Sequence, residues 1–159
     1  MGFHGAMHPD LRLELDDLTR PAVRALVARH LAGMQADTPP EDVHALGVDQ
    51  LRAPDITFWS AWVGDEVVGC GALRRLDAQN GELKSMRVAE AWLGQGVGRA
   101  VLEAITAHAR ASGLTHLWLE TGHPFVAART LYERAGFTYC GPFGSYEASA
   151  FSVFMTRAL

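Results

Sequence analysis

Apolar and polar positions divide the 159-residue chain into alternating strand-like and helical segments. Residues 11–15 alternate apolar and polar side chains as an edge strand does, and residues 21–34 carry apolar side chains at helical spacing. Two prolines interrupt residues 38–46, which predicts a loop or short helix of the kind that covers a substrate. The first part of the chain therefore predicts a strand, a helix and a covering segment.

Three β-rich runs follow. Residues 56–63 and 66–76 flank Gly64-Asp65, which is typical of a hairpin turn. Asn80-Gly81 is a second turn signal, and it predicts that the next strand covers only residues 83–88. Short turns between successive strands predict an antiparallel meander.

Helices and strands alternate in the rest of the chain. Apolar residues recur at helical spacing over 97–105 and stop near Gly113, and residues 116–120 form a short strand-like run. A strand, a helix and a strand in this order predict a right-handed crossover between parallel strands 83–88 and 116–120. A second helix over 125–135 and closing strands over 137–140 and 152–156 complete the predicted elements.

Glycines at positions 94, 96 and 98 separate the third strand of the meander from the following helix. Without Cβ atoms the backbone can approach a ligand closely, and the first amides of a helix are unpaired donors at the positive end of its dipole. A dinucleotide fingerprint needs its third glycine where this chain has Arg99 or Val101, and a Walker loop needs Gly-Lys-Ser/Thr. The remaining predictions are a pyrophosphate-binding loop or a tight turn without a ligand.

Two motifs carry a resemblance to a known family. Leu93-Gly-Gln-Gly-Val-Gly98 resembles motif A of the GCN5-related N-acetyltransferases (GNAT), Arg/Gln-x-x-Gly-x-Gly/Ala, except that Leu93 replaces the Arg or Gln. Ala128-Arg-Thr-Leu-Tyr-Glu-Arg-Ala-Gly-Phe137 is similar to the family's Ala-x-x-Leu-Tyr-x-x-x-Gly-Phe motif. The element order βααβββαβαββ also resembles that fold. The resemblance implies an α/β (α+β) acyl-CoA N-acyltransferase fold, in which helices flank a mixed central sheet and two parallel strands splay apart to admit a cofactor.

The resemblance also implies two catalytic residues. Tyr132 would protonate the coenzyme A sulfur as general acid, and the alternative is that its ring only packs a helix face. Glu82 lies four residues before Met86, where several family members carry a carboxylate that relays the amine proton. Strand alternation would place Glu82, Lys84 and Met86 on one face. The alternative is that Glu82 pairs with Lys84 or Arg74 and a water chain takes the proton.

The cofactor would contact the strand before the loop and the loop itself. By resemblance, the Met86 amide polarises the thioester carbonyl and Val88 binds pantetheine. Arg99 would attract the ribose phosphate, or else only pair with Glu103 along the helix. The predicted cofactor-binding residues are Met86, Arg87, Val88, Leu93, Gly94, Gln95, Gly96, Val97, Gly98, Arg99 and Ala100.

Candidates for binding the acceptor lie on the loop after the first helix, on the meander and on the last hairpin. They are His44, Trp59, Arg87, Glu120, Phe143 and Tyr146. A histidine such as His44 is more often a capping or packed residue, and Trp59 and Phe143 are more often core. Residues 38–46, 58–61, 119–122 and 140–143 resemble a subgroup of bacterial acetyltransferases whose acceptors are mostly unassigned.

Composition narrows the partners. A net charge of −4 and the absence of a Lys/Arg cluster argue against nucleic acid. Cys70 and Cys140 lack metal spacing, the chain start lacks a positive segment followed by an apolar run, and no apolar run is long enough to span a membrane. We therefore expect a cytoplasmic protein with reduced thiols, no metal and no membrane partner. The 48% hydrophobic content suits a single domain over residues 1–159, with 1–10 a candidate disordered tail, and a homodimer is compatible.

These features together predict an N-acetyltransferase. It would move an acetyl group from acetyl-CoA to a primary amine of a small molecule or protein by direct transfer in a ternary complex. No base neighbours Cys70 or Cys140 in sequence, which disfavours an acyl-cysteine route. The alternative is a non-catalytic acyl-CoA binding module that regulates a partner.

Overall fold

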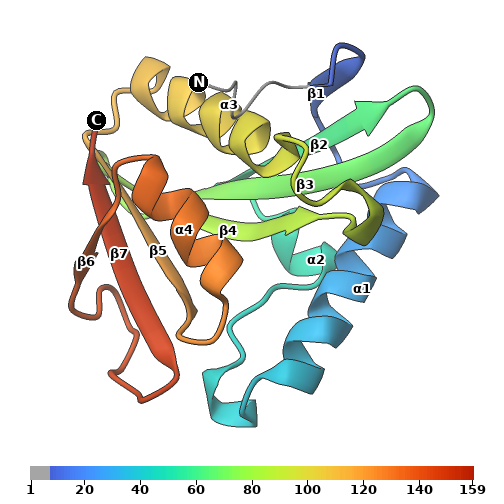
Figure 1. Ribbon diagram of the computed structural model, residues 1–159. Coiled ribbons are helices and arrows are strands. Elements are labelled where there is room, and N and C mark those ends of the chain that lie inside the picture. The colour runs from blue at the N-terminus through green and yellow to red at the C-terminus, as the bar shows by residue number, and fades with distance from the viewer. Residues whose placement is uncertain (1–7) are drawn as a thin grey trace.

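The computed structural model describes residues 8–159 and contains a seven-stranded sheet with strand order β1-β2-β3-β4-β5-β7-β6 (Figure 1). The strands are β1 (Leu11–Leu15), β2 (Ile56–Val63), β3 (Glu66–Arg75), β4 (Asn80–Val88), β5 (His116–Gly122), β6 (Thr138–Cys140) and β7 (Ser152–Ala158). The helices are α1 (Pro21–Asp37), α2 (Val48–Leu51), α3 (Val97–Ala111) and α4 (Val126–Arg134), with 3-10 turns η1 (Pro40–Asp42) and η2 (Glu90–Trp92). The predicted mixed sheet flanked by helices is confirmed.

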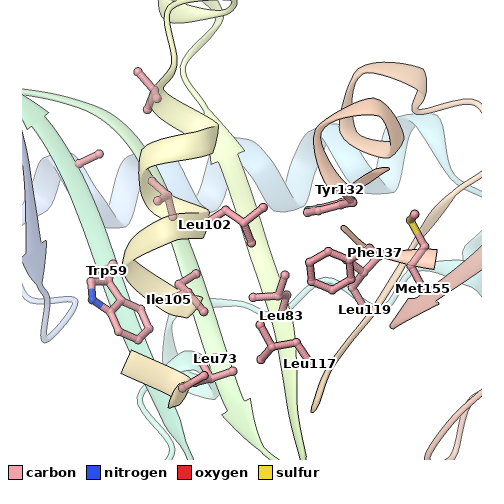
Figure 2. Close-up of a cluster of buried hydrophobic side chains, with 14 of the residues drawn as sticks. Trp59, Leu73, Leu83, Leu102, Ile105, Leu117, Leu119, Tyr132, Phe137 and Met155 are labelled. Atoms are coloured by element: carbon pink, nitrogen blue, oxygen red, sulfur yellow. The ribbon is translucent and has the colours of Figure 1, made fainter. Parts of the chain in front are cut away.

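Helices cover both faces of this sheet (Figure 1). On one face, Val23, Leu26 and Val27 of α1 are buried in a cluster that also holds Phe58 and Cys70. On the other face, α3 and α4 cover the larger cluster shown in Figure 2, where Ile105 of α3 and Tyr132 of α4 belong to the same apolar layer. The helical stripe predicted for α3 is confirmed, because its apolar residues form this layer.

The predicted tail over residues 1–10 falls largely on residues 1–7, which lie outside the described residues, while the Leu11 amide hydrogen-bonds the His8 carbonyl at 3.0 Å. The predicted turn at Asn80-Gly81 is wrong, because both residues belong to β4. A Cβ atom on Gly81 would lie 2.8 Å from side-chain atoms of Leu73 and Leu114, so this glycine permits close packing within the sheet.

Strands β4 and β5 are parallel and separate after a short contact. Their pairing covers only Asn80 with His116, Gly81 with Leu117 and Glu82 with Trp118. Beyond Glu82, β4 continues beside β3 and β5 continues beside β7. The predicted splay is therefore confirmed. It leaves the facing edges of both strands with backbone groups that no neighbouring strand pairs.

A β-bulge interrupts β4 within this splayed part. Ala72 of β3 pairs with Lys84 but Cys70 pairs with Arg87, so β4 contains one extra residue. Ser85 adopts a φ of 55°, and its carbonyl accepts a hydrogen bond from the Cys70 thiol at 3.3 Å. The bulge shifts the alternation of side chains from this point onward.

This shift corrects the predicted face of Met86. A Cβ built on Gly71 would lie 2.7 Å from Met86 Sδ and 2.7 Å from Val101 of α3, so Met86 faces α3. Glu82 and Lys84 share the opposite face, as their contact at 3.3 Å confirms. The prediction that all three side chains share a face is wrong because strand alternation assumes an unbroken register.

Candidate active site

A cavity of about 690 Å³ lies where β4 and β5 separate. Leu93 and Gly98 line it on the side of the glycine loop, and α1, β4, β5, α4 and the loops at residues 44–45 and 124–125 contribute the remaining walls. Nine of the predicted site residues line it: His44, Glu82, Met86, Arg87, Val88, Leu93, Gly98, Glu120 and Tyr132. The structure thus brings about half of the predicted site residues to one cavity.

The glycine loop has the geometry of an anion-binding site. Gly94 and Gly96 adopt φ values of 76° and 82°, which favour glycine. Helix α3 begins at Val97, and the Ala100 amide bonds the Gly96 carbonyl at 3.0 Å. The amides of the first helical turn before Ala100 therefore lack partners within the helix. These donors fit a pyrophosphate, which favours the ligand-binding interpretation of the loop.

The side chains around this loop contribute in different ways. A Cβ on Gly98 would lie 3.3 Å from Leu131 and 3.4 Å from Val88, so glycine lets α4 and β4 approach the helix start. Val97 and Ala100 are buried, so only their backbone groups can contact a ligand.

The other side chains of the loop are polar or exposed. Arg99 pairs with Glu103 at 3.0 Å, as the alternative interpretation anticipated. Leu93, in the position of the family's Arg or Gln, is 59% exposed. Gln95 donates to the Ala91 carbonyl at 3.4 Å.

Tyr132 projects from α4 into the larger core cluster (Figure 2). It also lines the cavity. Its ring packs edge-on against Phe137, with ring centroids 5.8 Å apart. Burial raises the pKa of the Tyr132 hydroxyl above its ordinary value, which keeps the hydroxyl protonated. Within residues 8–159, burial alone shifts this pKa, and no hydrogen bond to the hydroxyl contributes. The ring is packed as the structural alternative expected, and the hydroxyl remains available as a proton donor.

Glu82 is the last residue of β4 that pairs with β5, and it is only 3% exposed. Its Oε2 atom accepts hydrogen bonds from the Tyr146 hydroxyl at 2.5 Å and from Lys84 Nζ at 3.3 Å. Lys84 also donates to the Tyr146 oxygen at 3.0 Å. Arg74, the other partner considered, instead pairs with Asp55 at 3.3 Å. Glu82 is therefore a buried carboxylate with two donors.

Glu120 of β5 supplies a second carboxyl group to the cavity. Ser152 donates a hydrogen bond of 2.9 Å to its Oε2 atom. Burial raises the pKa of Glu120 to about 7, although Ser152 and the charge of Lys84 act in the opposite direction. The sequence predicts Glu120 only as an acceptor-binding residue. The raised pKa of Glu120 cannot be predicted from a local motif, because it depends on burial of the side chain by β5, β7 and the loop after α1.

Aromatic side chains form the wall behind the two carboxyl groups. The ring of Tyr146 lies 4.8 Å from that of His44 and 5.0 Å from that of Phe143, and Phe143 lies 5.5 Å from Trp118. Burial lowers the pKa of His44. Phe143 and Tyr146 do not line the cavity themselves, but Tyr146 contacts His44, Glu82 and Lys84, which do.

Trp59 lies apart from this group. It is 5% exposed, and its ring packs edge-on against His108 of α3 with centroids 5.1 Å apart. Figure 2 shows it on the opposite side of the core cluster from Tyr132. The alternation of β2 directs Trp59 toward α3, so the structure places it in the core as the structural alternative expected.

Within the described part of the chain, no group of three or more His, Cys, Asp and Glu side chains is arranged to hold a metal ion. No helix in residues 8–159 has the length and apolarity needed to cross a membrane.

The splayed parallel strands, the glycine loop at a helix start and the tyrosine beside the gap define the class of acyl-CoA N-acyltransferases. Residues 20–137 match the model of the Acetyltransferase (GNAT) family. This chain belongs to the GNAT family and is an acetyltransferase. The resemblance inferred from the two motifs is confirmed.

Two relatives support this assignment, and one solved structure supports the fold. The chain is 50% identical to the uncharacterized N-acetyltransferase YsnE of Bacillus subtilis (strain 168), over 94% of this chain and 100% of that protein. It is 46% identical to the uncharacterized N-acetyltransferase YedL of Escherichia coli (strain K12), over 92% of this chain and 94% of that protein. The crystal structure of a GNAT family acetyltransferase from Elizabethkingia anophelis with acetyl-CoA bound is similar in fold, with a TM-score of 0.71, 21% identity, and coverage of 96% of this chain and 100% of that one. Nothing in these relatives supports the non-catalytic alternative.

Proposed function

We propose that this enzyme transfers an acetyl group from acetyl-CoA to a primary amine of a small molecule or protein in a direct ternary complex. One observation carries the proposal: a single cavity connects the glycine loop, through Gly98, with Tyr132 and two carboxyl groups. A cofactor entering at the loop and an amine entering at the carboxyl end would meet beside the tyrosine. Direct transfer requires such a shared space.

The cofactor would be held mainly by backbone groups. Amides of the first turn of α3 would bind its pyrophosphate, and the unpaired edge of β4 at Met86 and Val88 would bind its pantetheine amides as an added strand. When bound, acetyl-CoA supplies an activated thioester. The amide of Met86 would donate to the thioester carbonyl and stabilise the negative charge that develops on its oxygen.

Proton transfer would use one group on each side of the reacting atoms. Glu120 would accept a proton from the acceptor ammonium, because a carboxyl group with a pKa of about 7 is suited to act as a base near neutral pH. Tyr132 would give its proton to the sulfur as the carbon–sulfur bond breaks and the carbon–nitrogen bond forms. Glu82, first predicted as the base, remains the second candidate, and its bonds to Lys84 and Tyr146 favour a supporting role.

The cysteines support direct transfer over an acyl-cysteine route. Cys70 is fully buried, and burial raises the pKa of its thiol to about 12, so it holds almost no thiolate at neutral pH. Neither Cys70 nor Cys140 lines the cavity. Both are free thiols, which supports the proposal that the enzyme works in the cytoplasm. We also propose that neither nucleic acid nor a membrane is a partner, and the net charge of −4 supports the first of these two points.

Thiol release in the presence of a broad panel of primary amines tests this proposal. We expect release of free coenzyme A that depends on both acetyl-CoA and an amine, together with one acetylated product per thiol. Incubation with acetyl-CoA alone is the control for hydrolysis. Saturable binding of acetyl-CoA without thiol release from any amine or protein acceptor would instead support the non-catalytic alternative.

A further inference from the structure

Arg87 occupies a separate part of the cavity because of the bulge in β4. In the register of β3 and β4, Arg87 lies opposite Cys70, which belongs to the cluster beneath α1, whereas Met86 faces α3. A Cβ on Gly33 of α1 would lie 4.0 Å from Arg87 Nη1. The guanidinium group therefore lies beside α1, on the face of the sheet opposite the glycine loop and the start of α3. A pyrophosphate bound at that loop would not reach it.

Two buried polar atoms in this part of the cavity lack protein partners. Arg87 Nε and His30 Nδ1 are buried without a hydrogen bond, and both residues line the cavity. Within residues 8–159 Arg87 also forms no ion pair, whereas Lys84 in the same cavity pairs with Glu82. Arg87 is half-buried, and its Nε donor is shielded from water without a partner, so an anion that accepted a hydrogen bond from it would offset the cost of that burial.

The titratable groups of α1 that face Arg87 do not neutralise its charge. His30 is the nearest titratable group of α1, and burial, together with the charge of Arg87, lowers its pKa to about 4. It is therefore neutral at pH 7 and adds no second cation. Asp37 of α1 also lines the cavity but does not pair with Arg87 in the described structure.

The cavity is thus divided by charge. Glu82 and Glu120 suit an ammonium group, and Arg87 with His30 suits an anion. Arg87 directly follows Met86, whose amide is assigned to the thioester, so an anion bound by Arg87 would lie a few bonds from the reacting amine. A guanidinium group matches a carboxylate with two parallel hydrogen bonds.

We propose that Arg87 and His30 bind a carboxylate of the acceptor, so that the substrate is a small amine that also carries a carboxylate. This inference rests on the proposed acetyl transfer and adds the chemical class of the acceptor. It also explains why an arginine stands in the splayed strand without a carboxylate partner.

The test compares amines that differ only in the carboxylate. The panel contains α- to ω-amino carboxylates with one to five carbons between the two groups, each paired with its carboxamide, and kcat/KM is expressed per free amine. We expect the best carboxylate to exceed its carboxamide by about 10- to 100-fold, the range for a hydrogen-bonded charge. In Arg87→Gln this ratio should fall to near one, and Arg87→Lys should keep part of it.

Arg29→Gln is the matched control, because Arg29 is an exposed arginine of α1 that does not line the cavity. It should retain the parent ratio. A parent ratio near one at every spacing overturns the proposal, as does an unchanged ratio in folded Arg87→Gln. If Arg87→Gln does not fold, the ratio of carboxylate to carboxamide in the parent and in Arg87→Lys tests the proposal instead.

Calorimetry on the protein saturated with coenzyme A separates this inference from the proposed function, because no acetyl group is present to react. Binding of amino carboxylates that weakens at least 10-fold in Arg87→Gln, with no thiol release in the turnover assay, supports the carboxylate site and contradicts acetyl transfer. Turnover of amines without preference for a carboxylate supports acetyl transfer and overturns the carboxylate site. Absence of both binding and turnover overturns both.

Discussion

The hydroxyl of Tyr146 donates a hydrogen bond of 2.5 Å to Glu82, although the two residues lie 64 positions apart. Lys84 contacts both partners. The loop between β6 and β7 is thereby attached to β4 at the point where β4 leaves β5. Burial, followed by the negative charge of Glu82, raises the pKa of Tyr146, so its hydroxyl stays a donor.

Removal of this donor should destabilise the fold. Tyr146→Phe leaves a carboxylate that is 3% exposed with Lys84 as its remaining donor, and we expect a loss of about 1–3 kcal/mol in the free energy of unfolding. Chemical denaturation measures it. Tyr139→Phe is the matched control, because the Tyr139 hydroxyl donates to Glu133 at an exposed position. Equal losses in the two variants would contradict a special role for the buried contact.

Cofactor binding at the glycine loop is tested by a pair of matched glycines. Gly94 and Gly113 have φ values of 76° and 83°, and a Cβ on either would meet no atom within 4 Å. Replacement by glutamate should therefore strain the backbone similarly, but only Gly94→Glu adds negative charge at the proposed phosphate site. We expect calorimetry to show acetyl-CoA affinity at least 10-fold weaker in Gly94→Glu and nearly unchanged in Gly113→Glu. Comparable affinities in both variants would place the phosphate elsewhere.

The pH dependence of turnover should identify the base. If Glu120 accepts the proton, kcat/KM rises with pH through an inflection near 7, where this carboxyl group loses its proton. Glu120→Gln should lose that inflection and regain activity only at alkaline pH, where the free amine is abundant. Glu82→Gln should keep the inflection. Loss of the inflection in Glu82→Gln, with the inflection kept in Glu120→Gln, would identify Glu82 as the base.

Stability should show the same titration independently of activity. The pKa of Glu120 is raised from 4.5 to about 7 in the folded protein, so the folded state binds the proton more tightly. Its contribution is therefore lost as pH rises through this window. Relative to the parent, Glu120→Gln should gain on the order of 2 kcal/mol in unfolding free energy between pH 5 and pH 8. Denaturation midpoints that change in parallel with pH would contradict the buried titration.

The sequence predicted best those features that local backbone chemistry determines. Gly96 could be placed at the start of α3 because a positive φ favours glycine, and Tyr132 could be placed in α4 because apolar residues recur at helical spacing. The face of Met86 could not be predicted, since one extra residue in β4 is a property of its pairing with β3. The titration of Glu120 likewise arises from burial by distant segments.

Tyr132→Phe tests the central claim, because it keeps the ring that packs against Phe137 and deletes only the proposed proton donor. Single-turnover measurements with saturating acetyl-CoA and a reactive amine observe the chemical step directly. We predict a rate roughly 100-fold lower, with acetyl-CoA affinity and melting temperature close to those of the parent. A folded Tyr132→Phe protein that transfers acetyl groups at the parent's single-turnover rate would contradict the assignment and leave solvent to protonate the thiolate.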